Sequence, residues 1–302
     1  MPRVTINGID TYYEVHGEGA PLLYFRGGYG GITSSVGVEV ARPSTAIFGE
    51  AVQVIDYHRR CEGLSEYDLT PFTFDDLGRD ADALIQHIGA ERVVVAGVSA
   101  GGPLALQFVL SHPERVRALV LACTGSAIMS THPYEDMSQV PPAIEARIEE
   151  VNRRMKLVTD ARAEGETALF ERLRERLRNP RSRAEPGSAA AAREEAFKAK
   201  LQDVSDDDLK TYFTGELRHM AANEEVNLSS RMHEITVPTL IVHGTADKMV
   251  PLQYGQDLAR AIPTARIVEI EGVGHNVVDD PRAKQVIQDW LAEVTASVTP
   301  ST

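Results

Sequence analysis

The residues that decide the fold are VVVAGVSAGGPLALQFVLS, which span positions 93–111. Their first part, VVVAGV at 93–98, is a continuous apolar run rich in valine, and such a run is typical of a strand buried on both faces of a sheet. The part from about Gly101 to Ser111 is apolar nearly all round, which predicts a deeply packed helix. A buried strand that leads directly into a buried helix indicates an α/β protein with a parallel sheet.

Ser99 stands where this strand gives way to this helix, within Gly97-Val98-Ser99-Ala100-Gly101. A serine on such a tight turn holds its hydroxyl above the edge of the sheet, and the flanking glycines allow the close approach that the turn needs. The N-terminus of the following helix favours negative charge that develops beside the hydroxyl. The pattern therefore predicts that Ser99 is a nucleophile, the alternative being an ordinary glycine-rich strand–helix turn.

The same strand–helix rhythm continues on both sides of this motif. Thr73 and Asp76 form a partial capping box for a helix whose apolar residues recur at helical spacing up to Gly89. Asp280-Pro281 opens a last helix with proline at its first position. We therefore expect a mostly parallel central sheet flanked by helices, with strands at 4–15 (two, around the turn Asn7-Gly8), 21–25, 52–57, 93–98, 118–123, 239–244 and 265–270.

The composition changes between the two parts of this α/β pattern. Residues 128–232 contain few β-branched runs and many Arg, Glu and Ala residues, which predicts a helical insertion. The chain is accordingly divided into a first core segment at 1–127, the insertion at 128–232 and a second core segment at 233–302. We expect a solvated helix face, and not an anion site, from the closely spaced arginines Arg172, Arg174, Arg176 and Arg178.

Composition and charge exclude several classes of function. The 302 residues are 43% hydrophobic and 25% charged, and the net charge of −13 should repel nucleic acid. No apolar run approaches the roughly 18 residues that a membrane span requires, and the N-terminus has no signal-peptide pattern. Cys61 and Cys123 cannot form a disulfide framework, so we expect buried thiols in a reduced, cytoplasmic compartment. No pattern indicates an oligomeric state.

A serine nucleophile needs a base and a group that orients the base. Nine histidines are present, and His275 stands out because Gly272-Val273-Gly274 places it on a small-residue loop after a strand. Asp247 follows the strand at 239–244 by a short turn and is the candidate orienting acid, its alternative role being an Asx turn or helix cap. The loop after Cys123 holds only Thr-Gly-Ser and offers no rival carboxylate.

The tetrahedral intermediate of acyl transfer needs two backbone N–H donors for its oxyanion. One candidate is the amide of Ala100, directly after the proposed nucleophile. The other candidate is Gly28, with Tyr29 as second choice, in the loop Arg26-Gly27-Gly28-Tyr29-Gly30-Gly31. A glycine-rich loop can also bind phosphate, but here no Lys-Ser/Thr pair follows and no GxGxxG is present.

These motifs resemble those of serine hydrolases of the α/β-hydrolase superfamily, of the esterase and lactonase kind. The order Ser99, Asp247, His275 is the Ser…Asp…His order of that superfamily. The resemblance covers nearly the whole chain, and the insertion at 128–232 stands where the superfamily has its cap domain.

Two loops carry the resemblance in more detail. The loop at 26–31 is similar to the His-Gly-Gly-Pro-Gly type of proline iminopeptidases, with Arg26 in place of His and Tyr29 in place of Pro. Residues 58–65 fit the frame Asp-x-Arg-Gly-x-Gly-x-Ser and depart from it at His58 and Cys61. Ala100 also departs, because the peptidases usually have a bulky aromatic residue there.

The resemblance implies a serine hydrolase that cleaves a small-molecule ester or lactone through an acyl-enzyme. It implies no metal and no organic cofactor, and the sequence shows no Cys/His cluster typical of zinc. The expected partner is a small-molecule substrate, with neither nucleic acid nor membrane. Candidate pocket residues beneath the helical cap are Tyr29, Met129, Met155, Phe170 and Tyr212.

Alternatives remain open at this point. An aminopeptidase or amidase acting on short peptides would need cap carboxylates for the substrate ammonium group, and the available ones are Glu145, Glu149, Glu150, Glu224 and Glu225. A noncatalytic receptor on a hydrolase fold is a further alternative, although such proteins often lose a triad residue. The same triad also supports cofactor-free perhydrolysis.

Overall fold

In the computed structural model, residues 2–36, 44–127, 142–180, 187, 189–224 and 226–296 are described. Within these residues one eight-stranded sheet has the order β1-β2-β4-β3-β5-β6-β7-β8. Its strands are β1 (Arg3–Ile6), β2 (Ile9–His16), β3 (Ala20–Phe25), β4 (Val52–Tyr57), β5 (Val93–Val98), β6 (Val116–Ala122), β7 (Thr239–Gly244) and β8 (Ala265–Ile270). β2 pairs antiparallel with β1 and β4, and all other neighbours are parallel, which confirms the expected sheet.

Alternate residues of each central strand pack on opposite faces of the sheet, as a side-chain period of two requires. In β5, Val93 and Val95 join the core under α3 (Phe74–His87), α4 (Gly101–Ser111) and α9 (Leu252–Ala261). Val94 and Ala96 join the core under α2 (Thr45–Phe48) and α10 (Pro281–Thr295). β5 is therefore covered by helices on both faces of the sheet.

The helix starts that the sequence predicts are present. The Thr73 side chain accepts a hydrogen bond from the Asp76 amide, and the Asp76 carboxylate accepts from the Thr73 amide, so the capping box is confirmed. Asp280 caps α10 through the Arg282 amide, with Pro281 at the first helical position. Both caps satisfy N–H groups that the first turn of a helix leaves without partners.

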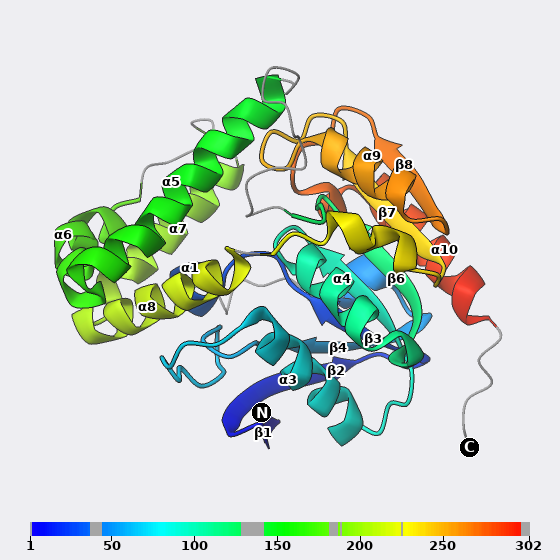
Figure 1. The fold of residues 1–302 in the computed structure, drawn as a ribbon, viewed down its shortest axis with the longest axis horizontal. Helices are drawn as coiled ribbons and strands as arrows, with labels where there is room; N and C mark the ends of the chain where they lie inside the picture. The colour runs from blue at the N-terminus through cyan, green and yellow to red at the C-terminus, as the bar shows by residue number, and fades with distance from the viewer. Residues whose placement is uncertain are drawn as a thin grey trace.

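Helices α5 to α8 follow β6 in the chain, precede β7 and gather at one end of the molecule (Figure 1). The short helix α1 (Gly31–Val36) lies against α8 in this layer. Among the described residues no helix is long and apolar enough to cross a membrane. The bounds of the four helices are α5 (Pro142–Glu164), α6 (Glu166–Arg178), α7 (Ala189–Asp203) and α8 (Asp206–Asn223).

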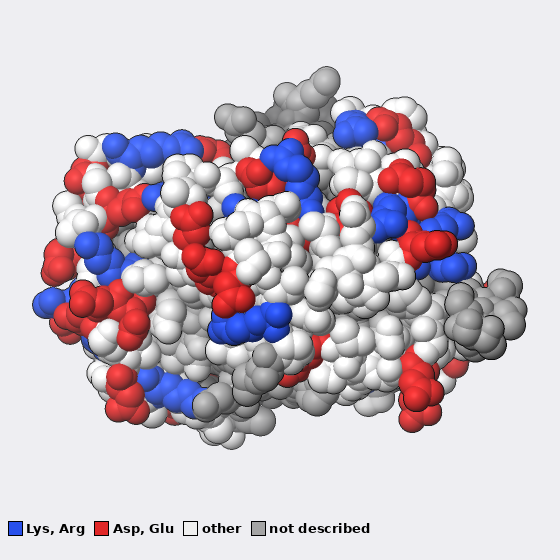
Figure 2. Space-filling model, turned by 90° about the horizontal axis from the view of Figure 1, so that it is seen from below, with Lys and Arg blue, Asp and Glu red and all other residues white. Residues whose placement is uncertain are grey.

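Acidic and basic side chains are interspersed on the face of the molecule that Figure 2 shows. Arg172 follows the expectation of a solvated face, because it is about half exposed and pairs with Asp160. Arg178 departs from it: its side chain is 16% exposed and donates to the carbonyls of Leu201 and Val204. Arg178 therefore joins α6 to the end of α7, a contact that helix periodicity alone does not reveal.

We expect Gly101→Ala to destabilise the protein by about 3 kcal/mol, in the upper range for an overpacked site. A Cβ atom at Gly101 would lie 2.1 Å from the Phe25 carbonyl oxygen, and backbone of a central strand cannot move aside cheaply. The matched control is Gly78→Ala inside α3, where a Cβ meets nothing within 4 Å. Helix propensity then predicts a gain of up to about 1 kcal/mol. Urea unfolding measures both changes, and equal stabilities of the two variants would contradict this account.

Candidate active site

Ser99 lies on the turn between β5 and α4, in a backbone conformation that is rare for any residue except glycine. Its φ is +51°, which costs an L-residue on the order of 1 kcal/mol. The conformation is held from both sides, because the Ser99 amide donates to Ala122 and its carbonyl accepts from the Gly102 amide and the Thr124 hydroxyl. The turn thus presents the hydroxyl in one orientation.

The glycines around Ser99 allow this turn to sit tightly between its neighbours. A Cβ at Gly97 would lie 2.6 Å from the Cβ of Ala105. A Cβ at Gly102 would lie 2.0 Å from the Thr124 hydroxyl oxygen, the same hydroxyl that binds the Ser99 carbonyl. Packing therefore requires glycine at positions 97 and 102.

The structure brings Ser99, His275 and Asp247 into one chain of hydrogen bonds. The His275 Nε2 atom lies 2.9 Å from the Ser99 Oγ, and its Nδ1 atom lies 2.8 Å from the Asp247 Oδ2. The three residues follow β5, β8 and β7, parallel strands whose carboxyl ends meet at one edge of the sheet. The Asp247 side chain is fully buried, whereas that of His275 is 17% exposed and open to a reactant.

Asp247 uses its two carboxylate oxygens for different purposes. Oδ1 accepts from the Met249 and Val250 amides at 2.8 and 2.9 Å, which is the Asx turn that the sequence offers as an alternative role. Oδ2 faces His275. Burial acts to raise the pKa of Asp247, but hydrogen bonds from His243, His275 and the Val250 amide outweigh it and hold the pKa well below its usual range.

An ionised Asp247 decides which nitrogen of His275 carries the proton. A carboxylate only accepts hydrogen bonds, so the proton of a neutral imidazole sits on Nδ1. Nε2 then has its lone pair toward Ser99 and accepts from the Ser99 hydroxyl. This is the arrangement in which an imidazole can remove a proton from a serine.

His243 is a buried residue of this site that the sequence reasoning missed. It is 0% exposed and donates from Nε2 to the Val250 carbonyl at 2.8 Å. The same Nε2 atom lies 3.5 Å from the Asp247 Oδ2. Its contact with the Val250 carbonyl is therefore stronger than its contact with the Asp247 carboxylate. His243 therefore holds the turn that carries Asp247, and its place at the end of β7 is the sequence signal that points to it.

The proposed oxyanion donors belong to two backbone segments, the start of α4 and the loop after β3. Ala100 is the N-cap of α4, where first-turn amides have no acceptor within the helix. The loop with Gly28 follows β3, and a Cβ at Gly27 would lie 3.2 Å from the Ser99 Cβ, so this backbone passes directly beside the serine. The positive φ of Gly28, +86°, shows why glycine suits that position. Their role as oxyanion donors stays a prediction.

A buried ion pair that sequence reasoning missed anchors this loop. The Arg59 guanidinium donates to the Gly28 carbonyl at 3.1 Å and to the Glu62 carboxylate at 2.7 Å. The two charged side chains are only 4% and 3% exposed. Burial raises the pKa of Glu62, but Arg59 outweighs it and lowers that pKa to about 2. Only the fold reveals the contact, because Arg59 and Gly28 belong to different loops.

Arg26, which stands where the resemblance leads one to expect histidine, has a structural partner. Its Nε atom donates to the Asp56 carboxylate at 2.6 Å, and a second guanidinium nitrogen binds the other carboxylate oxygen. Asp56 is in β4, next to β3 in the sheet, so this bidentate pair ties the start of the loop to its neighbouring strand.

The structure separates the candidate pocket residues into two groups. Tyr29 is 8% exposed and packs in a cluster with Ala100, against which Met155 of α5 also packs. Phe170 instead packs inside the helical layer with Phe213, in a cluster without Ala100. We therefore treat Phe170 as a packing residue.

Two further pocket candidates have different outcomes. The Tyr212 ring packs against the ring of Tyr67 with centroids 5.2 Å apart, and Tyr212 belongs to the cluster of the helical layer. Met129 lies outside the described residues.

The glutamates on which an aminopeptidase would depend do not favour that alternative. Glu150 binds Arg153 and Arg154, and Glu224 binds Arg162. The remaining two described candidates, Glu145 and Glu149, are exposed, and Glu225 lies outside the described residues.

Three groups of this site have atoms that a metal ion could bind. The Cys123 thiol, the Asp247 carboxylate and the His275 imidazole lie within 4.8 Å of one another. Burial and the neighbouring Asp247 raise the pKa of Cys123, which disfavours the thiolate that a metal would need. The donor set therefore fits the hydrogen-bond chain better than it fits a metal site.

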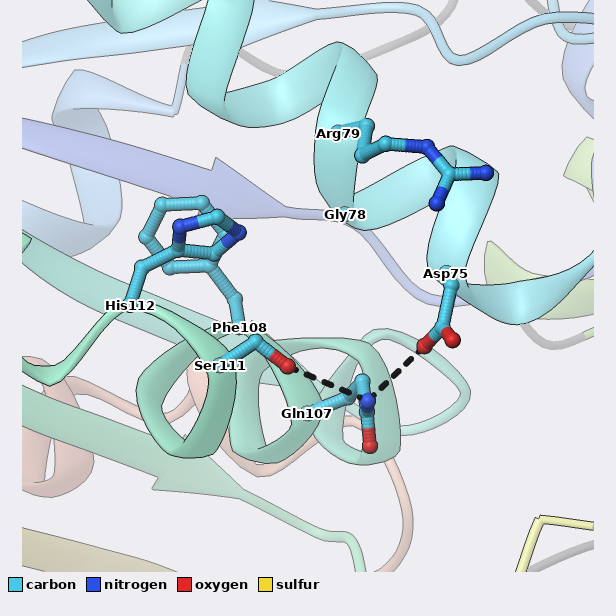
Figure 3. A pocket seen from close by; sticks show the side chains of 7 residues that line it. All are labelled: Asp75, Gly78, Arg79, Gln107, Phe108, Ser111 and His112. Carbon is cyan, nitrogen blue, oxygen red and sulfur yellow. Dashed lines mark hydrogen bonds between the residues drawn. The ribbon is translucent and has the colours of Figure 1, made fainter.

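A separate hollow of about 240 Å³ lies between α3 and α4. Figure 3 shows Asp75 and Arg79 of α3 on one side, and Gln107 and Ser111 of α4 on the other, with Gln107 bound to Asp75. Gln107 lies six positions after Gly101, the first residue of α4, which is about 9 Å along the helix at 1.5 Å per residue, whereas Ser99 precedes the helix. This hollow is therefore not part of the serine site.

Comparison with known proteins agrees with this fold. A sequence model of the alpha/beta hydrolase fold matches residues 56–281. A protein of Azorhizobium caulinodans, provisionally named as the carbamate hydrolase RutD, is 30% identical over 99% of this chain and 94% of its own length. The rhodomycin D methylesterase DnrP of Streptomyces peucetius is 27% identical over 74% of each protein.

Among solved structures, the enol-lactonase of Burkholderia xenovorans superposes with a TM-score of 0.66 at 21% identity, covering 98% of this chain and 100% of that one. An esterase of Thermogutta terrifontis gives 0.65 at 22% identity, covering 98% and 100%. At these identities the two structures support the fold.

Proposed function

The chain belongs to the alpha/beta hydrolase family and is a hydrolase, and we propose that it cleaves a small-molecule ester or lactone with Ser99 as nucleophile, His275 as base and Asp247 as orienting acid. The observation that carries this proposal is the continuous hydrogen-bond chain from Asp247 through His275 to Ser99. Its geometry matches the roles that acyl transfer requires of a nucleophile, a base and an orienting acid.

In the first half of the proposed reaction, the Ser99 oxygen attacks the substrate carbonyl while its proton passes to the His275 Nε2. The carbonyl oxygen becomes an oxyanion that the Ala100 and Gly28 amides bind. The buried Asp247 carboxylate stabilises the imidazolium that forms. His275 then gives the proton to the leaving alkoxide, and the acyl group remains on Ser99.

In the second half, His275 takes a proton from water, which attacks the acyl-enzyme. The tetrahedral intermediate collapses, the acid product leaves, and His275 returns the proton to Ser99. Because each half needs an imidazole that is neutral at its start, activity should fall as the pH is lowered and the imidazole becomes protonated. No metal or organic cofactor takes part in this scheme.

We further propose that residues 128–232 act as the cap of the site, between core segments 1–127 and 233–302. The support is the apolar cluster in which α5 meets the core loops, with Ile144 and Val151 of α5 packed among Tyr29 and Ala100. A cap of this kind would exclude water from the oxyanion and form part of the substrate pocket.

An ester or lactone is preferred over an amide because an alkoxide is a better leaving group than an amide anion. The methylesterase among the relatives supports an ester substrate, and the enol-lactonase shares the fold. The absence of nucleic acid and membrane partners, the lack of a cofactor and a cytoplasmic location stay predictions from sequence.

A substrate panel tests the proposal directly. We expect the purified protein to hydrolyse p-nitrophenyl esters or lactones at least 100-fold faster, in kcat/KM, than aminoacyl anilides. A fluorophosphonate probe should label Ser99, as mass spectrometry of the tryptic peptide would show. Absence of labelling together with absence of ester and lactone turnover would refute the proposal, and faster anilide cleavage would favour the peptidase alternative.

A further inference from the structure

One histidine of the helical layer, His219 of α8, is buried against the core. Its side chain is 0% exposed, and its ring meets the ring of Phe72 edge to face with centroids 5.1 Å apart. Burial and the nearby charge of Arg59 lower the pKa of His219 to about 3, so the imidazole is neutral near pH 7. The reaction scheme above does not involve this side chain.

The neutral imidazole uses only one of its two nitrogen atoms. Nε2 lies 2.8 Å from the Arg60 carbonyl oxygen, which only accepts hydrogen bonds, so Nε2 carries the proton and donates. Nδ1 is buried and has no hydrogen-bond partner within the part of the chain that the structure describes. A buried acceptor without a partner is unfavourable, and an apolar side chain would avoid that cost. The hydrogen bond from Nε2 is therefore the contact that favours histidine at position 219.

His219 also packs against the loop at 26–31, which carries the proposed oxyanion donor. A Cβ atom at Gly30 would lie 2.7 Å from the His219 Cδ2 and 2.7 Å from the Cys61 carbonyl oxygen. The same carbonyl accepts a hydrogen bond from the Gly31 amide at 3.2 Å. The Gly30 backbone therefore lies against both the imidazole and the backbone at Cys61, with space only for glycine.

The short segment 59–61 connects these contacts to the oxyanion donor. Arg59 donates to the Gly28 carbonyl oxygen at 3.1 Å, and the next residue, Arg60, is the one whose carbonyl accepts from His219. Peptide units are planar and stiff, so a shift of this segment would move the Gly28 carbonyl and the backbone next to it. His219 thus contacts the loop directly at Gly30 and indirectly through the segment that binds Gly28.

We propose that His219 is a positioning residue for the oxyanion loop and couples α8 of the helical layer to the reaction at Ser99. This inference rests on the proposed hydrolytic function. The His219 N–H fixes the Arg60 carbonyl and the ring fixes Gly30, so that the Gly28 amide is held where the oxyanion forms. Because His219 is fully buried, it acts through this loop and not by contact with substrate. Its loss should weaken binding of the transition state and leave ground-state binding unchanged.

Two substitutions separate the hydrogen bond from the bulk of the ring. His219→Leu removes the N–H, and we expect kcat for the best ester to fall about 10- to 100-fold with an unchanged KM, less than the loss of a whole oxyanion donor. His219→Gln keeps an N–H donor and should recover kcat to within about fivefold of the wild type. Active-site titration with a fluorophosphonate corrects each kcat for the fraction of active protein. Equal losses in the two variants would contradict a role of the hydrogen bond.

A tetrahedral inhibitor reports on the oxyanion site directly. A trifluoromethyl ketone forms an adduct with Ser99 that carries an oxyanion, so its Ki should rise in His219→Leu by about the factor by which kcat falls. An unchanged Ki together with a reduced kcat would show that the substitution acts elsewhere, and would overturn the positioning role.

Arg218→Met is the matched control for a general loosening of α8. Arg218 precedes His219 and donates to the Leu69 carbonyl oxygen at 2.7 Å, so it also ties the helix to the core, but outside segment 59–61. We expect this variant to unfold at a lower temperature and to keep the wild-type kcat. A loss of kcat equal to that of His219→Leu would overturn the specific role of His219.

Hydrogen exchange keeps the inference independent of turnover. The Gly31 amide, which donates to the Cys61 carbonyl, should exchange at least about tenfold faster in His219→Leu than in the wild type, while the amides of β5 keep their rates. Unchanged exchange at Gly31 and an unchanged kcat, with Ser99-dependent turnover intact, would overturn the positioning role and leave the hydrolase proposal standing. Faster exchange in a protein without Ser99-dependent turnover would refute the hydrolase proposal and retain His219 as the residue that holds this loop.

Discussion

We expect Ser99→Ala to lower kcat for ester hydrolysis by on the order of a million-fold. The loss is this large because the base and the oxyanion donors cannot act without the serine nucleophile. The substitution removes the Ser99 Oγ atom, which lies 2.9 Å from the His275 Nε2 atom. Nothing in the turn opposes the change, because the bonds that hold it involve the Ser99 backbone amide and carbonyl. The variant should therefore fold normally.

Steady-state kinetics with the best ester of the panel, together with thermal unfolding, measure this prediction. Ser111→Ala is the control, since Ser111 stands at the far end of the same helix and is exposed. The control should retain full activity. Turnover by Ser99→Ala within tenfold of the wild type, in a preparation free of contaminating esterase, would show that Ser99 is not the nucleophile.

Asp247→Asn is expected to reduce kcat about 10⁴-fold, because an amide in place of the carboxylate favours the wrong tautomer of His275. The asparagine oxygen can still accept from the Met249 and Val250 amides, so the turn persists. Its NH₂ group then faces the His275 Nδ1 and donates to it. The imidazole proton moves to Nε2, where it blocks the lone pair that must accept the Ser99 proton.

The matched control is Asp257→Asn, because Asp257 pairs with Arg260 on the outer surface of α9. We expect its kinetics to equal those of the wild type. A kcat for Asp247→Asn above a tenth of the wild-type value would refute the assignment of the orienting acid.

The low pKa of Asp247 also predicts the shape of the pH profile. A carboxyl group whose folded-state pKa is depressed stays ionised until the pH falls through that low value, so its protonation does not limit activity above about pH 4. A loss of activity above about pH 4 should then not come from protonation of Asp247. An NMR titration in which the Asp247 carboxyl is half protonated above about pH 4 would contradict this.

Local patterns predict the α/β core because the elements of a buried sheet are encoded residue by residue. The apolar runs of β5 and β7 are buried on both faces, and the turn chemistry at Thr73 and Asp280 begins the helices where expected. The short α1 is different. A Cβ at its first residue, Gly31, would lie 2.4 Å from the Cβ of Glu216, so α1 is set by packing on α8, and no local pattern predicts it.

Local patterns are enough to predict the sheet, the serine turn and the loops that carry Asp247 and His275, because parallel strands bring their carboxyl ends to one edge whatever the details of packing. Only the folded chain shows that Arg59 binds the Gly28 carbonyl and that Arg147 and Arg154 contact Tyr29. It also decided that Phe170 packs away from Ala100. Hydrophobic periodicity shows which face of a helix is buried, but which residues of distant segments meet that face depends on how the helices pack against the core.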